Sequence, residues 1–398
     1  MGKIGFADKA SGFVNELPKK IHCKMETEVK QKIIEGRASY EKLGEILRSL
    51  GVKKYLLVYT GSAKRLPVWQ YLADLDLPRT LFSGFTPNPK YEEIVAGVDL
   101  FNAEKCDAVL AVGGGSAIDV AKCIKLYCKM PKDEIYLKQE YTDTQIPLIA
   151  LPTTAGTGSE STPFSVIYYG GEKQSVKHPS ILPDVAILDS DVLLSLPVYQ
   201  KKCTVLDALC QAIESWWSVY STDESRAYAK AAVERIVANL YEYVEQNTER
   251  AREEIMSASN LAGRAIGITA TTAPHAMSYK LTTTYGFPHG HSVALSLPRV
   301  WKYMLAHPEK CTDTRGADYL FATFSEIARS LGYETAEQAA EGFEAMLSRL
   351  EIGYPAETDK DEKAKYFAAS VNVLRLGNNP VALDSEALYQ LYRGMFIS

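Results

Sequence analysis

Hydrophobic and polar positions follow two different periods along this chain of 398 residues. Between about Lys53 and Asp189, short runs rich in β-branched and aliphatic residues alternate with longer segments whose apolar residues recur every three or four positions. This pattern predicts strands at 53–59, 79–84, 107–115, 147–154 and 184–189, and helices at 90–106 and 116–130. Such alternation indicates an α/β fold with a mostly parallel sheet covered by helices.

The pattern changes at residues 194–197, after which the strand signals fade. Helical periodicity then covers residues 201–218, 224–246, 249–268, 325–332 and 335–353. The chain is also too long for one hydrophobic core. We therefore expect an α/β domain over residues 1–194 and an all-α domain over residues 195–398. Residues 25–51 are predicted to run from an edge strand into the first helix.

Composition and charge narrow the functional classes. The chain is 46% hydrophobic and 23% charged, as in an ordinary soluble globular protein. Its net charge is −5 and neither end carries a basic block, which argues against a nucleic-acid or anionic-membrane partner. No apolar run is long enough to span a bilayer, and the first twenty residues do not resemble a signal peptide. Seven cysteines without a Cys-x-x-Cys pair indicate reduced thiols, so we expect a cytoplasmic protein.

A glycine-rich turn is the first sign of a ligand. In "AVLAVGGGSAIDVAK", Gly113, Gly114 and Gly115 lie between an apolar strand and a helix that begins at Ser116. Backbone N–H groups in such a turn can approach a pyrophosphate, and the helix start adds positive potential. Ile118 stands where a full dinucleotide fingerprint has its third glycine, so a tight turn without a ligand is the alternative.

A second polar loop, "LPTTAGTGSEST", follows the next predicted strand. It concentrates hydroxyl groups where α/β sheets bind ligands, at the carboxyl ends of strands. A loop that only caps a helix would explain one such segment. Two of them at consecutive strand ends favour a nucleotide site.

A carboxylate and several histidines in the second half suggest a metal. Asp207 stands inside the apolar segment "VLDALCQAI", and Gln211 follows on the same helical face. His275 and Tyr279 have the same spacing, and His289 comes ten residues later. Burying an unpaired carboxylate costs several kcal/mol, which a bound cation would offset. Mixed nitrogen and oxygen ligands suit iron or zinc, although histidines with satisfied partners in the core are the alternative.

Five segments in order carry a family resemblance: "GGGSAIDVAK", "PTTAGTGSE", "LDALCQAIE", "PHAMSYKL" and "GFPHGHSVALSLP". Together they resemble the iron-containing (group III) alcohol dehydrogenase family. That family has the dehydroquinate synthase-like fold, in which a dinucleotide-binding α/β domain precedes a helical domain. The resemblance implies cofactor contacts at Gly113, Gly114, Gly115, Ser116, Asp119, Thr153, Thr154, Thr157, Thr162 and Lys173.

The resemblance also implies a divalent metal, with Fe2+ expected and Zn2+ as the alternative. Asp207, His275 and His289 match three of the family's four ligand positions, whereas Gln211 stands where the family usually has histidine. An amide oxygen is a poorer ligand than imidazole, so we expect a lower affinity. Tyr279 also replaces a usual histidine. Its hydroxyl suits proton donation during carbonyl reduction, so we assign Tyr279, His275 and His289 to catalysis.

The expected cofactor is NADPH, with NADH as the alternative. The strand at 53–59 is followed by Thr60, Gly61 and Ser62, and then by Lys64 and Arg65. A carboxylate at this strand end would bind a ribose 2′-hydroxyl and repel a 2′-phosphate, but none is present. Small donors and cations suit the phosphate, although the two cations can also simply be solvated.

The strings "LDALCQAIESWWSVYSTDES", "HAMSYKLTTTYGFPHGH" and "SVKHPSILPD" are most similar to the family's phosphonoacetaldehyde reductase branch. This resemblance implies reduction of phosphonoacetaldehyde to 2-hydroxyethylphosphonate. A dianionic phosphonate needs cations, so candidates are Lys177, His178, Arg264, Lys280 and His291, with Lys280 first. His291 can instead pack in the core. Trp216 and Trp217 are expected to pack the helical domain, with one of them lining the pocket as the alternative.

Three other functions stay open on the sequence. The chain can be a general alcohol dehydrogenase acting on a short-chain aldehyde or diol, or a dehydroquinate-synthase-like lyase. Because Gln211 and Tyr279 depart from the family pattern, it can also be a binding protein without activity. Dimers are common among relatives, so we expect a homodimer.

Overall fold

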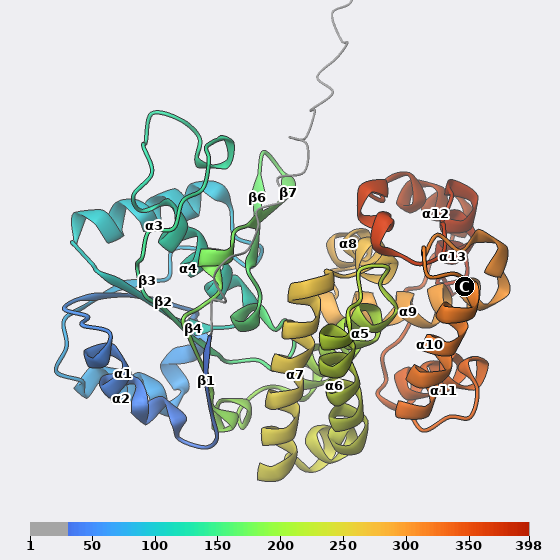
Figure 1. Ribbon diagram of the computed structural model, residues 1–398, viewed down its shortest axis with the longest axis horizontal. Coiled ribbons are helices and arrows are strands. Elements are labelled where there is room, and N and C mark those ends of the chain that lie inside the picture. Colours follow the sequence, from blue (N-terminus) through green and yellow to red (C-terminus); the bar gives the residue numbers. More distant parts are fainter. Residues whose placement is uncertain (1–30, 398) are drawn as a thin grey trace, which may run out of the picture.

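The first half of the chain is built on a six-stranded parallel sheet (Figure 1). The computed structural model describes residues 31–397, apart from the side chains of residues 373–375, so Cys23 and the segment compared with a signal peptide lie outside it. The strand order is β1 (Lys32–Glu35), β8 (Val185–Leu188), β5 (Leu148–Pro152), β4 (Ala108–Gly113), β2 (Tyr55–Tyr59) and β3 (Arg79–Phe82). The five predicted strands and the predicted edge strand are thereby confirmed.

Helices cover both faces of this sheet. Successive residues of a strand point to opposite sides, and the inner strands carry apolar side chains on both. The covering helices are α1 (Leu43–Ser49), α2 (Pro67–Asp74), α3 (Tyr91–Ala103) and α4 (Gly115–Tyr127). Leu57 and Leu110 belong to a core that includes residues of α1 and α2, whereas Leu56 and Val109 belong to a second core with α3 and α4. The first of these cores continues without a break into the helical half of the molecule.

An antiparallel hairpin, which the sequence analysis did not predict, leaves the sheet between β5 and β8. It consists of β6 (Phe164–Tyr169) and β7 (Glu172–Lys177), joined at Gly170 and Gly171, which both have positive φ angles. Figure 1 shows the hairpin between the two halves, on the side where α8 lies. The hairpin therefore extends the first half toward the helices of the second.

The second half is helical, as predicted, with no strand in the described residues after Leu188. It contains α5 (Val198–Trp217), α6 (Asp223–Tyr241), α7 (Glu249–Thr269), α8 (Ala273–Tyr285), α9 (His289–Ala306), α10 (Ala317–Ser330), α11 (Ala336–Arg349), α12 (Lys360–Ala369) and α13 (Ser385–Arg393). Trp216 and Trp217 are buried in its core, where Trp217 contacts Trp301, which confirms their predicted packing role. The boundary expected between residues 194 and 195 falls between β8 and α5 and stays a prediction.

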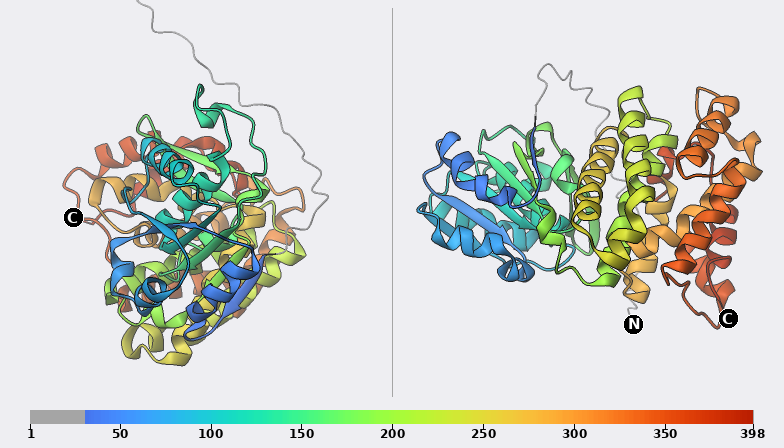
Figure 2. Two further views of the ribbon diagram at one scale, coloured as in Figure 1. Left: turned by 90° about the vertical axis from the view of Figure 1, so that its left-hand side faces the viewer. Right: turned by 90° about the horizontal axis from the view of Figure 1, so that it is seen from below.

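Two helices contact the loop after β5 in the first half: Thr204 of α5 lies against Gly156, and α7 lies against Gly158. Helix α5 packs against α6, α7 and α9 and forms the centre of the helical half. Helix α7 lies next to the first half (Figure 2), where its Gly263 contacts Gly158 in the loop after β5. Over residues 31–397, none of the helices is both long enough and apolar enough to cross a membrane.

Candidate metal and cofactor site

Three side chains from three different helices converge in the helical half. Asp207 comes from the middle of α5, His275 from the first turn of α8, and His289 is the first residue of α9. Each offers one ligand atom, and these atoms all lie within 4.8 Å of one another. Among the acidic, histidine and cysteine side chains of residues 31–397, these three are spaced closely enough to hold a metal ion together.

Polar atoms in this cluster lack the partners that buried groups usually have. Asp207 Oδ1, Gln211 Oε1 and His275 Nε2 are all buried and make no hydrogen bond among the described residues. Asp207 Oδ1 and His275 Nε2 are 3.3 Å apart, which makes an ion pair when the imidazole is protonated, although the geometry is not that of a hydrogen bond. Leaving a buried polar atom unsatisfied costs about 1–3 kcal/mol. A cation bound by two oxygens and two imidazole nitrogens would remove this cost, so the residues fit the first-row divalent metal that the sequence predicts.

The protonation of the two imidazoles is set by burial and by nearby carboxylates. Burial lowers the pKa of His289 to about 4, so its ring is neutral and can act as a ligand. Burial also acts to lower the pKa of His275, but Glu214 and Asp207 raise it to about 10. A metal ion at Nε2 would replace the proton that this nitrogen otherwise holds.

Glu214 is a buried acid that the sequence analysis missed. Its carboxylate accepts hydrogen bonds from His275 Nδ1 at 2.5 Å, from the Thr272 backbone N–H at 2.7 Å and from Thr272 Oγ1 at 2.9 Å. The sequence did hold a signal, because Glu214 follows Asp207 by seven residues on an apolar helix. Two helical turns place both acids on one face.

Tyr279 lies beside this cluster with a cation on its ring. The ring stacks parallel to His289, with centroids 6.1 Å apart, and Lys173 Nζ lies 3.6 Å from the Tyr279 centroid. Lys173 comes from β7 of the hairpin. Its positive charge acts to lower the pKa of both His289 and Asp119. The hairpin therefore places one ammonium group between the candidate metal ligands and the glycine-rich turn.

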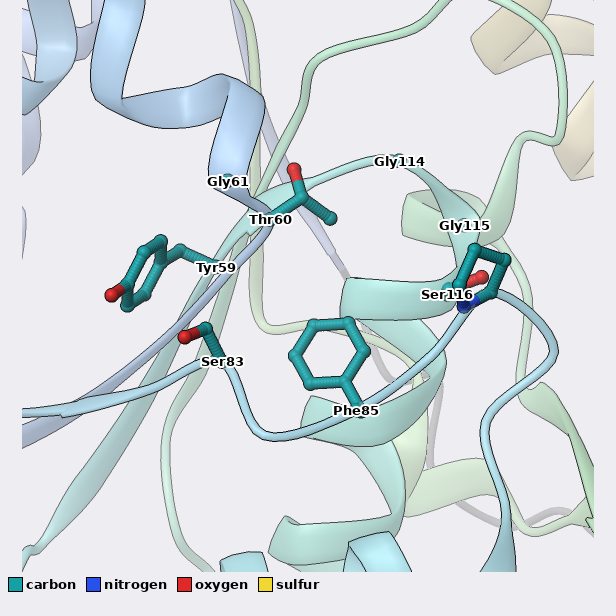
Figure 3. A pocket seen from close by; sticks show the side chains of 9 residues that line it. Tyr59, Thr60, Gly61, Ser83, Phe85, Gly114, Gly115 and Ser116 are labelled. Carbon is teal, nitrogen blue, oxygen red and sulfur yellow. The ribbon is translucent and has the colours of Figure 1, made fainter.

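A pocket of about 310 Å³ opens at the carboxyl ends of β2, β3 and β4 (Figure 3). It is lined by Tyr59, Thr60, Gly61, Ser83, Phe85, Pro87, Gly114, Gly115 and Ser116. Thus several of the predicted cofactor residues meet around one pocket. Thr60 Oγ1 and Ser62 Oγ lie 3.0 Å apart at its edge. Lys64 Nζ instead lies over the rings of Tyr59 and Trp69, at 5.4 and 5.8 Å from their centroids.

The loop after β5 lies against the glycine-rich turn. Side chains of Thr154 and Thr157 are neighbours of Gly114 and Gly115, and Thr153 N–H donates to the backbone oxygen of Gly113. This arrangement brings together the two loops that the sequence analysis singled out.

Other predicted cofactor residues of this region face inward. Thr162 Oγ1 accepts a hydrogen bond at 2.9 Å from Lys122, which is fully buried. Asp119 accepts from Ser159 Oγ at 2.6 Å and from the Val166 N–H at 3.1 Å. These contacts give Thr162 and Asp119 a role in holding the loop and the hairpin on α4.

The candidate substrate cations are dispersed rather than gathered. Lys280 Nζ donates to Tyr366 Oη at 3.2 Å, and Arg264 donates to Tyr228 Oη at 2.6 Å. His291 is buried, with its ring nitrogens at hydrogen-bond distance from Tyr199 Oη and the Gly353 backbone oxygen, which favours the packing alternative for this residue. His178 Nδ1 contacts Ser180 on η5 (Pro179–Ile181), and Lys177 is exposed at the end of β7.

Two family models match almost the whole described chain. The model of the iron-containing alcohol dehydrogenase matches residues 30–190. The model of the C-terminal part of the Fe-containing alcohol dehydrogenase family matches residues 202–396. The two matched ranges follow the division between the sheet and the helices.

Several relatives are similar over most of their own length. A phosphonoacetaldehyde reductase from Streptomyces viridochromogenes is 31% identical over 314 residues, 75% of this chain and 79% of the relative. An NADPH-dependent butanol dehydrogenase from Clostridium saccharobutylicum is 32% identical over 67% of this chain and 71% of its own. The crystal structure of sulfoacetaldehyde reductase from Bifidobacterium kashiwanohense in complex with NAD+ superposes with a TM-score of 0.82 at 28% identity, covering 92% of this chain and 96% of that one.

Proposed function

Because this chain belongs to the iron-containing alcohol dehydrogenase family, we propose that it reduces a small aldehyde carrying a phosphonate group, most specifically phosphonoacetaldehyde. Family membership makes it an oxidoreductase that uses a nicotinamide cofactor and a divalent metal. The observation that carries the proposal is the convergence of Asp207, His275 and His289 within 4.8 Å. Gln211 completes the proposed ligand set.

The proposed chemistry divides between the bound groups and the chain. A divalent ion at this site supplies Lewis-acid polarisation of the aldehyde oxygen, and the reduced nicotinamide supplies the hydride. The chain's own part is to hold the ion through Asp207, Gln211, His275 and His289. Tyr279, which stacks on His289, offers its hydroxyl as the proton donor to the product alcohol. The mostly buried cluster limits access of water to the reacting carbon.

Two similarities support an anionic substrate. The relatives named phosphonoacetaldehyde reductase and sulfoacetaldehyde reductase both have, in their names, a two-carbon aldehyde that carries a tetrahedral oxyanion. In this chain Lys173 Nζ lies against Tyr279, next to the candidate metal ligands. That ammonium is the cation we propose for the phosphonate, in addition to its predicted cofactor contact. This role would replace that of Lys280, which contacts Tyr366 instead.

We propose NADPH as the preferred cofactor. The pocket at the end of β2 is lined by Thr60 and Gly61, and no acidic side chain lines it. A 2′-phosphate would therefore meet small donors without a repelling carboxylate. The NADPH-dependent butanol dehydrogenase is in keeping with this choice, whereas the sulfoacetaldehyde reductase structure contains NAD+.

A substrate panel tests the proposal. Protein loaded with Fe2+ or Zn2+ is assayed with phosphonoacetaldehyde, sulfoacetaldehyde and butanal, each with NADPH and NADH. The expected result is the highest kcat/KM for phosphonoacetaldehyde with NADPH. A highest value for butanal would instead establish the general alcohol dehydrogenase alternative, and no loss of reduced cofactor with any aldehyde would contradict the oxidoreductase assignment.

A variant of Lys173 tests whether this residue binds the substrate or only the cofactor. Replacing it with glutamine should raise the KM for phosphonoacetaldehyde by about tenfold or more, whereas the KM for butanal should change little. An equal rise for both aldehydes, together with a rise in the KM for NADPH, would restrict Lys173 to cofactor binding. Light scattering of the same preparations checks the expected homodimer.

A further inference from the structure

The carboxylate of Glu214 is a buried acceptor with no solvent contact. Its side chain is fully buried on α5, two turns beyond Asp207. Oε1 accepts from His275 Nδ1, and Oε2 accepts from both the N–H and the hydroxyl of Thr272. Both oxygens are therefore used, and a buried charge is hydrogen-bonded as its desolvation requires.

The same carboxylate is fixed in place by the start of α8. Thr272 is the N-cap residue of this helix, and His275 is its third residue. Thr272 Oγ1 donates to Glu214 and accepts a hydrogen bond from Trp217 Nε1 at 3.0 Å. A helix start also favours a nearby anion. The N–H and the hydroxyl of Thr272 thus hold the Glu214 carboxylate in place independently of its contact with His275.

This geometry fixes which nitrogen of His275 is available. A carboxylate can only accept, so the Nδ1 atom that faces Glu214 carries the hydrogen. Nε2 is then the atom left to bind an ion, and it lies 3.3 Å from Asp207 Oδ1, on the cluster side of the ring. The carboxylate also fixes the rotation of the ring, because a hydrogen bond at Nδ1 sets the direction in which the Nε2 lone pair points.

We propose that Glu214 is a positioning residue of the metal site: it holds His275 with Nδ1 protonated and Nε2 directed at the ion. This inference rests on the metal use in the proposed function, and it adds a residue that binds neither ion nor substrate. Removing such an outer carboxylate from metal-binding histidines weakens metal affinity by about 10- to 100-fold.

Replacement of Glu214 with glutamine tests the role with little change of volume. If the amide oxygen keeps the Thr272 contacts, the amide N–H group faces Nδ1, which favours the tautomer with hydrogen on Nε2. The dissociation constants of Zn2+ and Co2+ are measured by competition with a chromophoric chelator, together with the visible absorbance of bound Co2+. We expect Glu214→Gln to bind both ions about 10- to 100-fold more weakly and to change the Co2+ spectrum.

Thr272→Val is the matched control. It removes one hydrogen bond to Glu214 and the acceptor of Trp217, but it keeps the contact between Glu214 and His275. We expect a lower unfolding temperature with ion affinities close to those of the unchanged protein. Equal weakening in the two variants would show a merely structural role and overturn the inference, as would unchanged ion affinity in folded Glu214→Gln. If that variant does not fold, Glu214→Asp takes its place with the same expected weakening.

Two failures are distinguishable in this design. An unchanged protein that binds Co2+ tightly but reduces no aldehyde would contradict the proposed function and leave the role of Glu214 intact. A Glu214→Gln protein that binds Co2+ as tightly as the unchanged protein would contradict only the inference about Glu214.

Discussion

Gly290 of α9 lies directly against the backbone of Cys203 on α5. A Cβ atom at Gly290 would come within 2.0 Å of the Cys203 carbonyl oxygen and within 2.8 Å of Asp207 Cβ. Only a residue without a side chain permits this approach. The contact sets how closely the helix that carries His289 approaches the helix that carries Asp207.

Replacing Gly290 with alanine should separate these helices. A methyl group pressed against backbone cannot be accommodated by side-chain rotation, so we expect a loss of about 1–3 kcal/mol in the free energy of unfolding. Bound metal should fall more steeply than stability, because His289 and Asp207 move apart. Urea unfolding and elemental analysis of dialysed protein measure the two effects. Gly353→Ala, where nothing lies within 4 Å of the added atom, is the control, and full metal content in Gly290→Ala would contradict the prediction.

Replacing Gln211 with histidine should strengthen metal binding. The change supplies the imidazole that the family usually has at this position and removes a buried amide oxygen that lacks a hydrogen bond. Imidazole is the better ligand for iron and zinc, so we expect about a tenfold or greater gain in affinity. Chelator competition measures it. Gln211→Met keeps the length without a ligand oxygen and should weaken binding; identical affinities for the three proteins would remove residue 211 from the ligand set.

Replacing Gly61 with aspartate should reverse the expected cofactor preference. The position lines the pocket at the end of β2, and a Cβ there meets nothing within 4 Å, so the backbone leaves room for a side chain. Like charges about 4 Å apart repel by ~1–4 kcal/mol at effective dielectric constants of 80 to 20. The KM for NADPH should therefore rise about tenfold or more, while that for NADH stays the same or falls.

Gly61→Asn is the neutral control for that change, because it has nearly the same shape without the charge. If asparagine raises the KM for NADPH as much as aspartate does, shape rather than charge is responsible. Such a result would contradict the proposed 2′-phosphate contact near the end of β2.

Replacing Gly263 with alanine should loosen the contact between α7 and the loop after β5. The added atom would lie 2.6 Å from the Gly158 oxygen and 2.7 Å from its Cα. We expect a loss of about 1–3 kcal/mol in the free energy of unfolding and a higher KM for the cofactor, since this loop contacts the glycine-rich turn. Gly267→Ala on the same helix meets its nearest atom at 3.4 Å and should stabilise the helix by about 0.5–1 kcal/mol. Equal thermal unfolding midpoints for both variants would contradict the prediction.

The centre of the parallel sheet could be predicted from sequence because its inner strands β2, β4, β5 and β8 are buried along their whole length. Val109, Leu110 and Ala111 of β4 are all fully buried, so the strand appears in the sequence as a continuous apolar run. The β6–β7 hairpin could not be found in this way. Its second strand, "EKQSVK", has one buried residue, Val176, and carries polar side chains elsewhere, so neither periodicity nor apolar runs mark it.

The candidate ligands were predictable because Asp207 is conspicuous in an apolar helix, but their surroundings were not. Lys173 and Tyr279 are far apart in the chain and meet only because the hairpin reaches α8. Glu214 stands at the end of an apolar segment, where an acid is usually solvated. Its burial depends on the start of α8 lying above it, which is a tertiary contact.

Helix α5 carries Asp207, Gln211 and Glu214 on one face, so both proposed oxygen ligands and the outer acid belong to a single helix, while the two proposed nitrogen ligands come from neighbouring helices. The spacing among the oxygens is fixed by the hydrogen-bonded repeat of one helix, but the distance from the oxygens to the nitrogens depends on how the helices pack. Partial loosening of the helical half would therefore degrade the site unevenly. A partly loosened protein would keep the two oxygen ligands, which suit hard ions such as Mg2+, and would bind iron or zinc more weakly.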